Sequence, residues 1–381
     1  MLSESRRLVG LGWSAEVRHN DDAFDDLEGD WSDLVSRYAA ATPFQSYAWL
    51  RSWWRAYGRP GALRLALVRH DGRLVAAAPL TLRHRAGCPV LAPLGEPFAD
   101  FTDVLIADDD AGAASRLTGA LLRQPGWQAI DLPEVRPGSA AGTRLAPAWP
   151  GRRWRTPASL CLELPASEIA DLVRALPAHS RKTVRRRLNQ LDRSGIEVRE
   201  VEPADAARAT ADLLRLHARQ WQGRGGNPEH LTGRFQEFLA TAAGDMLADG
   251  SATLFEYRLE GRLTASSLVL VGRELAGGYL YGAEPELRER VDVTTMLLAD
   301  VLPLALRQGC PTMSMLRGAE EHKRRWRPAE SQHEGLLLAR PGSARGAAYG
   351  AGVSAMRRAR RTARDRAPWL RAVRDRIRGR R

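Results

Sequence analysis

The stretch Arg317–Lys323, RGAEEHK, gathers the side chains best suited to acid–base chemistry in this sequence. It follows a predicted strand over 312–316, and a glycine at a strand end followed by mixed charges places polar groups at a sheet edge. Glu320 or His322 could act there as a general base, while Arg317 or Lys323 could bind an anionic substrate or a phosphate. The alternative is that these side chains form surface ion pairs.

A second candidate is the predicted strand from Glu274 to Tyr281, which contains adjacent glycines at Gly277 and Gly278. Two residues without side chains let a ligand or another backbone approach closely, although a bulge or a tight sheet crossing would need them as well. Tyr279 and Tyr281 alternate onto one face of this strand, where Tyr281 could donate a proton to a leaving group. Packing with a hydrogen-bonded hydroxyl is the alternative.

Two groups of basic side chains could bind phosphate: Arg288 and Arg290, and Arg181, Lys182 and Arg185. The first group just precedes a helix predicted over 291–307, whose N-terminal dipole favours anions. The second belongs to a basic helix over 179–191 with a narrow apolar seam, so most of its charge points outward. Either group could instead be solvated surface.

Three further side chains are candidates for substrate binding. Asp100 and Asp103 could line a cleft between two parts of the molecule, or they could cap or turn the chain. Trp221 lies four residues after His217, on the same face of a predicted helix, and core or interface packing is its alternative role.

The elements that must position these residues repeat along the chain. Val68–Ala77 aligns with Tyr257–Ser266 at a constant offset of 189 residues, with five identities in ten positions. Each segment centres on a turn signal, Asp71-Gly72 or Glu260-Gly261, between two strand-like runs. A hairpin that recurs at half the chain length suggests two copies of one α/β unit. The order helix, hairpin, third strand, helix and further strand predicts mixed α/β sheets, two of them side by side.

This repeat suggests three parts. Residues 1–157 form the first unit, residues 158–338 the second unit with the candidate chemistry, and residues 339–381 an arginine-rich tail. A stretch rich in proline, glycine and alanine, 133–157, connects the units.

Composition indicates a globular protein, because 44% of the 381 residues are hydrophobic and 27% are charged. No apolar run reaches the roughly 18 residues of a membrane span, and the N-terminus lacks a secretory pattern, so we expect a cytoplasmic protein. Three scattered cysteines predict neither a disulfide framework nor a metal site. The motifs GxGxxG, Walker A, HExxH and GxSxG are all missing, which removes the usual support for dinucleotide, NTP, zinc-protease and α/β-hydrolase chemistry.

The positive charge is concentrated in the tail. Residues 341–381 hold 13 arginines and two aspartates, and so carry +11 of the formal +12. Roughly helical apolar spacing there suits a basic amphipathic segment on an anionic membrane face, which would place the protein at the inner side of the membrane. Nucleic-acid binding is the less favoured rival, and a solvated tail is the third possibility.

Several motifs in order resemble one family. They are FQSYAWLRSWW (44–54), the hairpin that ends in Ala78-Pro79-Leu80, LGEPFADFTDVL (94–105), HSRKTVRRRL (179–188), LHARQWQGRGG (216–226), YLYGAEPELRER (279–290) and SMLRGAEEHKRRW (314–326). Together they cover about residues 30–330 and resemble GNAT-superfamily acyltransferases of the CelD-like type, which are found with cellulose-biosynthesis clusters and are related to the FemAB peptidoglycan transferases.

The resemblance implies tandem GNAT-like units, each a mixed and largely antiparallel sheet flanked by helices. It also implies transfer of an acyl group from acyl-CoA, most simply acetyl-CoA, to an amine or hydroxyl of a cell-envelope or polysaccharide precursor. Gly277 and Gly278 would then hold the pantetheine arm. Two alternatives stay open: an aminoacyl-tRNA-dependent transferase like the FemAB relatives, and a non-catalytic scaffold recruited to the membrane.

This chain departs from the family pattern near its end. Ser314 stands where relatives have Asp, four residues before the glycine, and His322 stands where they have Tyr before Lys323. Roles of that Asp and Tyr therefore do not transfer to this chain. The Gly-rich pyrophosphate loop usual in the superfamily is also not visible after Tyr281.

Overall fold

The predicted hairpin repeat is present in the backbone geometry. The computed structural model describes residues 12–222, 227–318 and 320–366. In both hairpin turns the two central residues have positive φ, 49° and 79° at Asp71 and Gly72, and 52° and 75° at Glu260 and Gly261. This is the turn that matches the right-handed twist of paired strands. The ladder of each hairpin shifts register just beyond its turn, so the two copies share a bulge as well as a turn.

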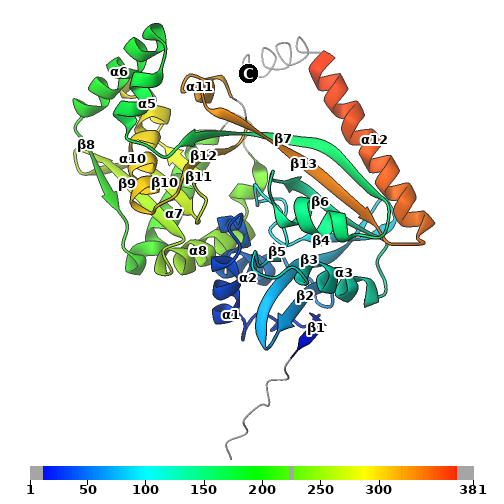
Figure 1. The fold of residues 1–381 in the computed structure, drawn as a ribbon. Coiled ribbons are helices and arrows are strands. Elements are labelled where there is room, and N and C mark those ends of the chain that lie inside the picture. The colour runs from blue at the N-terminus through cyan, green and yellow to red at the C-terminus, as the bar shows by residue number, and fades with distance from the viewer. Residues whose placement is uncertain (1–11, 223–226, 319, 367–381) are drawn as a thin grey trace, which may run out of the picture.

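The elements follow the expected mixed order (Figure 1). The first part of the chain contains β1 (Trp13–Arg18), α1 (Glu28–Ser36), α2 (Tyr47–Tyr57), β2 (Leu63–His70), β3 (Arg73–Arg85), β4 (Cys88–Pro93), β5 (Leu105–Ile106), α3 (Ala113–Arg123), β6 (Ala129–Val135), α4 (Ala146–Ala148) and β7 (Arg153–Pro165). The second part contains α5 (Ile169–Ala175), α6 (Ala178–Asp192), β8 (Ile196–Glu200), α7 (Ala206–Trp221), α8 (Gly233–Ala248), β9 (Ala252–Leu259), β10 (Arg262–Val271), β11 (Leu275–Ala283), α9 (Leu287–Arg290), α10 (Val293–Arg307), β12 (Thr312–Arg317), α11 (Glu321–Arg324), β13 (Ala329–Ala339) and α12 (Ala344–Arg366).

Within the described residues, all thirteen strands form one connected sheet in the order β1-β2-β3-β4-β6-β13-β7-β12-β11-β10-β9-β8, with β5 paired to β3. The expectation of two separate sheets side by side is therefore wrong. The mixed α/β class is confirmed, because two strand pairs, β4–β6 and β11–β12, are parallel while the others are antiparallel.

The sheet is nevertheless two copies of one pattern, joined by strands that pass through both. β7 pairs with β13 through 153–157 on one side of the junction and through 160–163 on the other. The first half-sheet is therefore β1-β2-β3-β4-β6 followed by 334–339 of β13 and the start of β7. The second is β8-β9-β10-β11-β12 followed by the end of β7 and 329–332 of β13. The first half-sheet thus includes residues 334–339 from late in the chain, and the second includes the end of β7, which precedes its other strands.

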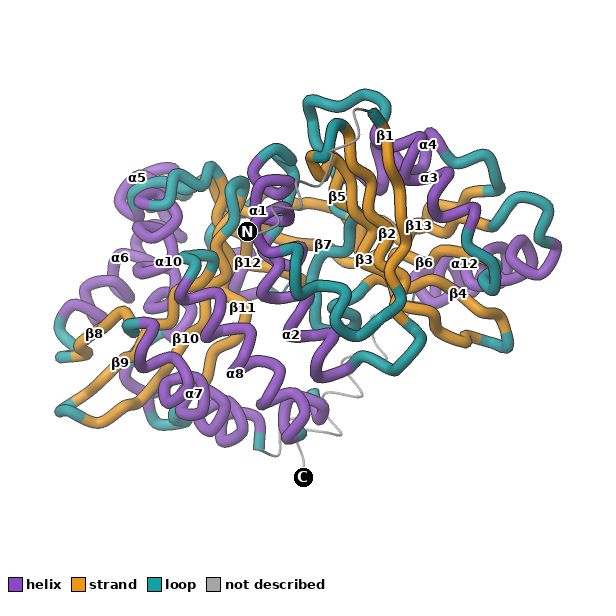
Figure 2. Tube along the Cα trace, turned by 90° about the horizontal axis from the view of Figure 1, so that it is seen from below, coloured by secondary structure: helices purple, strands orange, loops and turns teal. Residues whose placement is uncertain are grey.

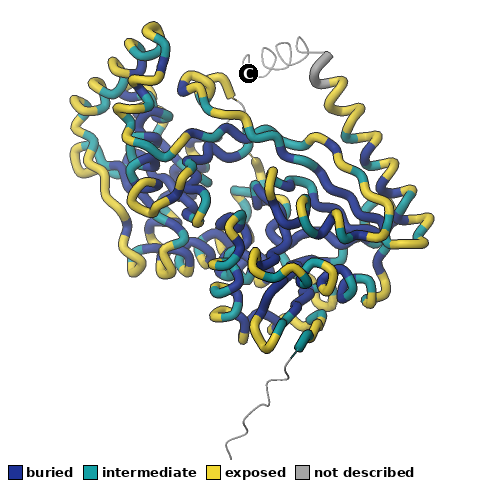
Figure 3. The backbone as a smooth tube through the Cα atoms, viewed as in Figure 1, coloured by how far each residue is buried: buried dark blue, intermediate teal, exposed yellow. Residues whose placement is uncertain are grey.

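Helices pack on the sheet and on each other across the junction. Figure 2 shows α2 and α8 next to one another between the half-sheets, and these two helices make extensive contact. Side-chain caps define several helix starts, as where Ser46 Oγ accepts a hydrogen bond from the Trp49 backbone N–H at 3.2 Å. Trp49 then lies edge-on to both Phe238 and Tyr279, so aromatic rings from both halves fill the junction, which is buried in Figure 3.

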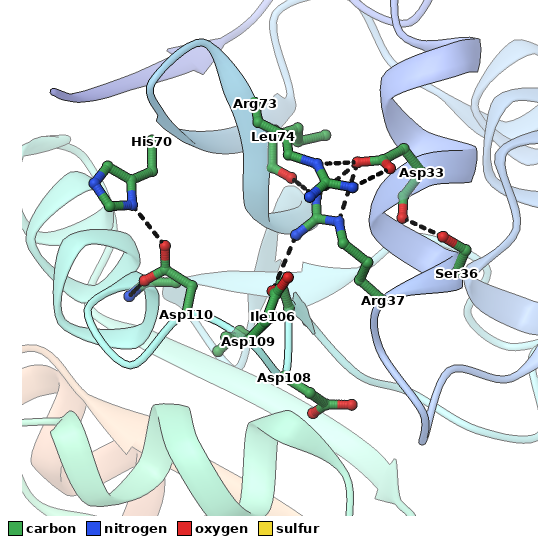
Figure 4. Close-up of polar contacts among 12 residues, drawn as sticks. Asp33, Ser36, Arg37, His70, Arg73, Leu74, Ile106, Asp108, Asp109 and Asp110 are labelled. Atoms are coloured by element: carbon green, nitrogen blue, oxygen red, sulfur yellow. Dashed lines mark hydrogen bonds and ion pairs between the residues drawn. The ribbon is translucent and has the colours of Figure 1, made fainter. Parts of the chain in front are cut away.

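A polar network braces the first half-sheet (Figure 4). Asp33 of α1 accepts hydrogen bonds from both Arg37 and Arg73, which lower the pKa of its carboxyl to about 2. Nearby, His70 lies 2.9 Å from a carboxylate oxygen of Asp110. These contacts tie α1 to the β2–β3 hairpin and to the loop after β5.

Part of the predicted tail is a docked helix. α12 packs against β6, β7 and β13, and its Tyr349 hydroxyl donates to Asp131 at 2.9 Å. Arg357 on the same helix also donates to Asp131, at 2.8 Å. The remainder of the tail, 367–381, lies outside the described residues, so membrane binding stays a prediction. None of the helices in the described ranges combines the length and apolar character needed to cross a membrane.

Candidate active site

The strands β11 and β12 enclose a cavity because they diverge. They pair in parallel only over 275–277 and 312–314, and beyond that point the register of β12 against β7 is also broken. The gap holds a cavity of about 230 Å³, which we call the β11–β12 cavity. Seven residues singled out in the sequence line it: Asp100, Gly278, Tyr279, Tyr281, Arg317, His322 and Lys323.

β11 has a bulge at this cavity. The ladder between β10 and β11 pairs Leu268 with Leu280 and then Val269 with Gly278, so Tyr279 has no partner in the register. A bulge leaves the extra residue outside the ladder. Tyr279, which lines the cavity, is thus the residue of β11 that stands outside the β10–β11 ladder.

The adjacent glycines Gly277 and Gly278 of β11 have different surroundings. A Cβ on Gly277 would lie 2.8 Å from the Leu316 side chain, which is buried and whose φ is 55°. The absence of a side chain at Gly277 therefore leaves room for Leu316, where β12 diverges from β11. Because Leu316 covers Gly277, this glycine does not line the cavity. A Cβ on Gly278 would meet nothing within 4 Å, and this glycine lines the cavity.

Both tyrosines face the cavity. Tyr279 also packs edge-on against Phe44 and Trp49 of the first part of the chain, and burial raises the pKa of its hydroxyl well above the usual range. The Tyr281 carbonyl lies 2.8 Å from His217 Nδ1, which ties β11 to α7.

Arg317 and Asp100 form an ion pair that joins the two parts of the chain at the cavity wall. Arg317 Nε lies 2.5 Å from Asp100 Oδ1, and the Arg317 backbone N–H donates to Asp100 Oδ2 at 3.3 Å. Burial opposes the charge of Arg317, but Asp100 outweighs it and raises the pKa of the guanidinium. The cation predicted to bind substrate is thus already paired.

Among the candidate bases, geometry favours His322. Lys323 Nζ donates to the carbonyls of Met315 and Arg317 and pairs with Glu320 at 2.8 Å, so it holds the end of β12. Burial opposes ionisation of Glu320, but this hydrogen bond outweighs it and lowers its pKa. Glu320 does not line the cavity, whereas His322 does, and partial burial lowers the pKa of His322. His322 is therefore neutral and able to accept a proton at pH 7.

The predicted basic helix forms a groove of about 870 Å³, which we call the basic groove. It is lined by Ala178, Arg181, Lys182, Arg185, Arg186, Asn189, Gln190, Arg193, Ser194 and Arg290, with no acidic residue among them. Arg187 pairs with Asp292 at 2.8 Å, and Asp292 caps α10. The next turns of α10 line the β11–β12 cavity, whereas no residue of α10 lines the basic groove.

Three candidates lie elsewhere. Arg288 is exposed on α9 and Trp221 is half-buried at the end of α7, and neither lines the two hollows. Asp103 is 5% exposed and accepts hydrogen bonds from the Tyr38 hydroxyl and from the backbone N–H groups of 104, 140 and 141. Burial raises the pKa of Asp103 to about 6. These contacts give Asp103 a structural position away from solvent.

Sequence reasoning missed the apolar wall of the cavity. Thr294, Leu297, Leu298 and Val301 come from one face of α10, opposite methionines of β12. In the sequence they are indistinguishable from residues that pack a core.

Comparison with known proteins agrees with this geometry. Residues 178–324 match the family model of the acetyltransferase (GNAT) domain. Over this segment the chain is similar to a GNAT domain. The matched segment contains α6, the bulged β11, α10 and α11, and so includes most of both hollows. A search of curated proteins gives no significant match.

Solved structures extend the likeness of fold beyond the matched segment. FemX is 12% identical and superposes with a TM-score of 0.57 over 81% of this chain and 95% of its own. L-PGS from Bacillus licheniformis is 12% identical, with a TM-score of 0.52 over 83% and 93%. A conserved protein of unknown function from Bacteroides thetaiotaomicron is 14% identical, with a TM-score of 0.54 over 82% and 97%. At such identities the likeness concerns the fold, and it spans both half-sheets.

Proposed function

We propose that this protein transfers an acyl group from a thioester, most simply acetyl-CoA, to an amine or hydroxyl. The observation that carries the proposal is the cavity beside the bulge of β11, a strand within the segment 178–324 that matches the GNAT model. Such a transfer needs a bound acyl carbonyl, a group that accepts a proton from the nucleophile and a group that assists the leaving thiolate.

The donor would occupy both hollows. The acyl group and the pantetheine arm would lie in the β11–β12 cavity, against the backbone of Tyr279 and the apolar wall of α10. The phosphates of CoA would reach the basic groove, where exposed Lys182 and Arg185 carry positive charge.

The proton transfers follow from the side chains at the cavity. The nucleophile attacks the thioester carbonyl, and neutral His322 takes its proton. The C–S bond then breaks as the carbonyl re-forms, and the thiolate takes a proton from the Tyr281 hydroxyl. Both residues line the cavity, and no covalent enzyme intermediate is required.

An aminoacyl-tRNA donor is the second candidate. The basic groove supports it, because a lining rich in cations and without an acidic side chain suits a nucleic-acid backbone as well as a single CoA. The fold likeness to FemX is compatible with this donor. In either case the acceptor we propose is a cell-envelope or polysaccharide precursor, made at the inner face of the membrane.

A thermal-shift series decides between donors. The full-length protein is titrated with acetyl-CoA, longer acyl-CoAs and free CoA, and separately with charged and uncharged tRNA. Stabilisation by acyl-CoA that is lost in Lys182→Glu/Arg185→Glu supports the first proposal. Stabilisation by charged tRNA alone moves the assignment to the second. No stabilisation by any donor would leave the non-catalytic scaffold.

A further inference from the structure

A third cavity, of about 850 Å³, shares a wall with the β11–β12 cavity. Both are lined by Asp100 and Arg317, the ion pair that joins the two parts of the chain. The third cavity continues from this pair to the C-terminal helix, where Arg357, Arg360 and Arg361 line it. We call it the arginine cavity. Its volume is within the range of pockets for small ligands.

The docking of α12 places these arginines. Tyr349 and Arg357 both bind the buried carboxylate of Asp131 on β6, and this fixes the helix on the sheet. Figure 1 shows α12 lying alongside β7 and β13. Arg360 and Arg361 follow Arg357 by one turn, at the cavity. A segment that composition assigns to a loose basic tail therefore builds one side of a pocket.

The negative charges of the arginine cavity are already engaged, but part of its positive charge is not. Asp100 is paired with Arg317. Burial favours the neutral form of Glu134, but hydrogen bonds from His333 and Ser159 outweigh it and lower its pKa. Arg360, by contrast, is exposed and forms no ion pair with any residue that the structure describes. The acidic side chains of the cavity thus have partners, while the positive charge of Arg360 is available to a ligand.

We propose that the arginine cavity binds the acceptor substrate, and that the acceptor carries a phosphate or carboxylate group held at Arg360. The anionic end would lie against α12, while the amine or hydroxyl points to the shared wall at Arg317, next to the acyl carbonyl. This assignment rests on the proposed acyl transfer. It names the acceptor as a small anionic molecule, since guanidinium groups bind phosphate and carboxylate oxygens through paired N–H donors.

Phosphate binding to the full-length protein tests the site. Titration calorimetry measures the affinity for inorganic phosphate and for glucose 1-phosphate, with chloride holding the ionic strength constant. Arg360→Glu should weaken phosphate binding at least about tenfold, because it replaces a charge-assisted contact with repulsion. Arg358→Glu is the matched control, since Arg358 is exposed on the same helix but does not line the cavity. Equal effects of the two variants would overturn the site.

The basic groove is a competing phosphate site, and a third variant separates the two. Phosphate affinity that survives Arg185→Glu but not Arg360→Glu supports the arginine cavity. The reverse pattern, or no measurable binding by the wild type, overturns it.

The two proposals fail in different ways. Acetyl-CoA stabilisation of Arg360→Glu should equal that of the wild type. If acetyl-CoA binds but the affinity for phosphate does not depend on Arg360, the acceptor assignment alone is wrong. If the affinity for phosphate depends on Arg360 but no acyl donor binds, the acyl-transfer proposal fails. The acceptor assignment then fails with it, because it rests on that proposal.

Discussion

The two half-sheets have the same strand order, but they differ at the gap between their parallel strands. The gap is filled in the first half-sheet and open in the second. In the first, β4 and β6 pair at only two positions, and residues 94–104 fill the space beyond. Phe101 is buried there against Phe44 and His333, and Thr102 N–H donates to the Glu134 carbonyl of β6. In the second, β11 bulges and β12 turns away, which leaves a cavity. One copy of the pattern thus serves as support, and the other keeps room for a ligand.

The largest expected effect is a loss of activity, and it tests whether the reaction takes place in the β11–β12 cavity. His322→Gln should lower kcat about 100- to 10,000-fold, the range for loss of a general base. Its pH profile should change too. The base must be neutral, so wild-type kcat/KM rises with pH through a pKa below 6.5, and the variant loses this limb. Rates of CoA release measure both.

His84→Gln is the control for this test, because His84 is an exposed histidine of the first half-sheet. A His322 variant as active as the control would remove the proposed base.

Opening the filled gap between β4 and β6 should lower the free energy of unfolding without creating a second acyl-CoA site. Phe101→Ala deletes a ring that is 1% exposed, and we expect about 3–5 kcal/mol less free energy of unfolding. Urea denaturation measures the loss. The number of acyl-CoA molecules bound per chain should not rise, and a second bound molecule would contradict the contrast between the gaps.

Filling the open gap should have the complementary result. Gly278→Leu places a side chain where a Cβ meets no atom within 4 Å, so the fold is kept while the cavity is lost. A displaced donor reacts at least about 100-fold more slowly. Activity and melting temperature are measured together.

Gly277→Ala is the neighbouring comparison, since its Cβ would meet Leu316 at 2.8 Å. It should destabilise the fold by about 1–3 kcal/mol through overpacking. If Gly278→Leu lost stability and Gly277→Ala did not, our assignment of the two glycines would be reversed.

The smallest effect concerns the buried carboxyl of the first half-sheet. Burial raises the pKa of Asp103 from 3.8 to about 6, so between these values the native state holds a proton that the unfolded state has lost. Stability from this group is therefore present below pH 4 and is lost as pH rises through about 6. Asp103→Asn should flatten this part of the stability profile, as measured by denaturation at several pH values. An unchanged slope would show that Asp103 does not titrate there.

Local patterns predicted much of the site, and long-range pairings account for what they missed. Turn residues and alternation were enough to place both hairpins, and polar types at strand ends pointed to Arg317 and His322. The exchange of β7 and β13 depends on partners more than 160 residues apart, which no local pattern encodes. The docking of α12 likewise depends on one distant carboxylate, Asp131.

The exchange of strands also sets when the molecule can fold. The first half-sheet needs residues 334–339, which are synthesised only after strands β8 to β12 of the second half-sheet. Until then β6 has an open edge, and an open edge can pair with other chains. The two half-sheets consequently cannot mature independently, and a chain cut between them would leave both half-sheets incomplete.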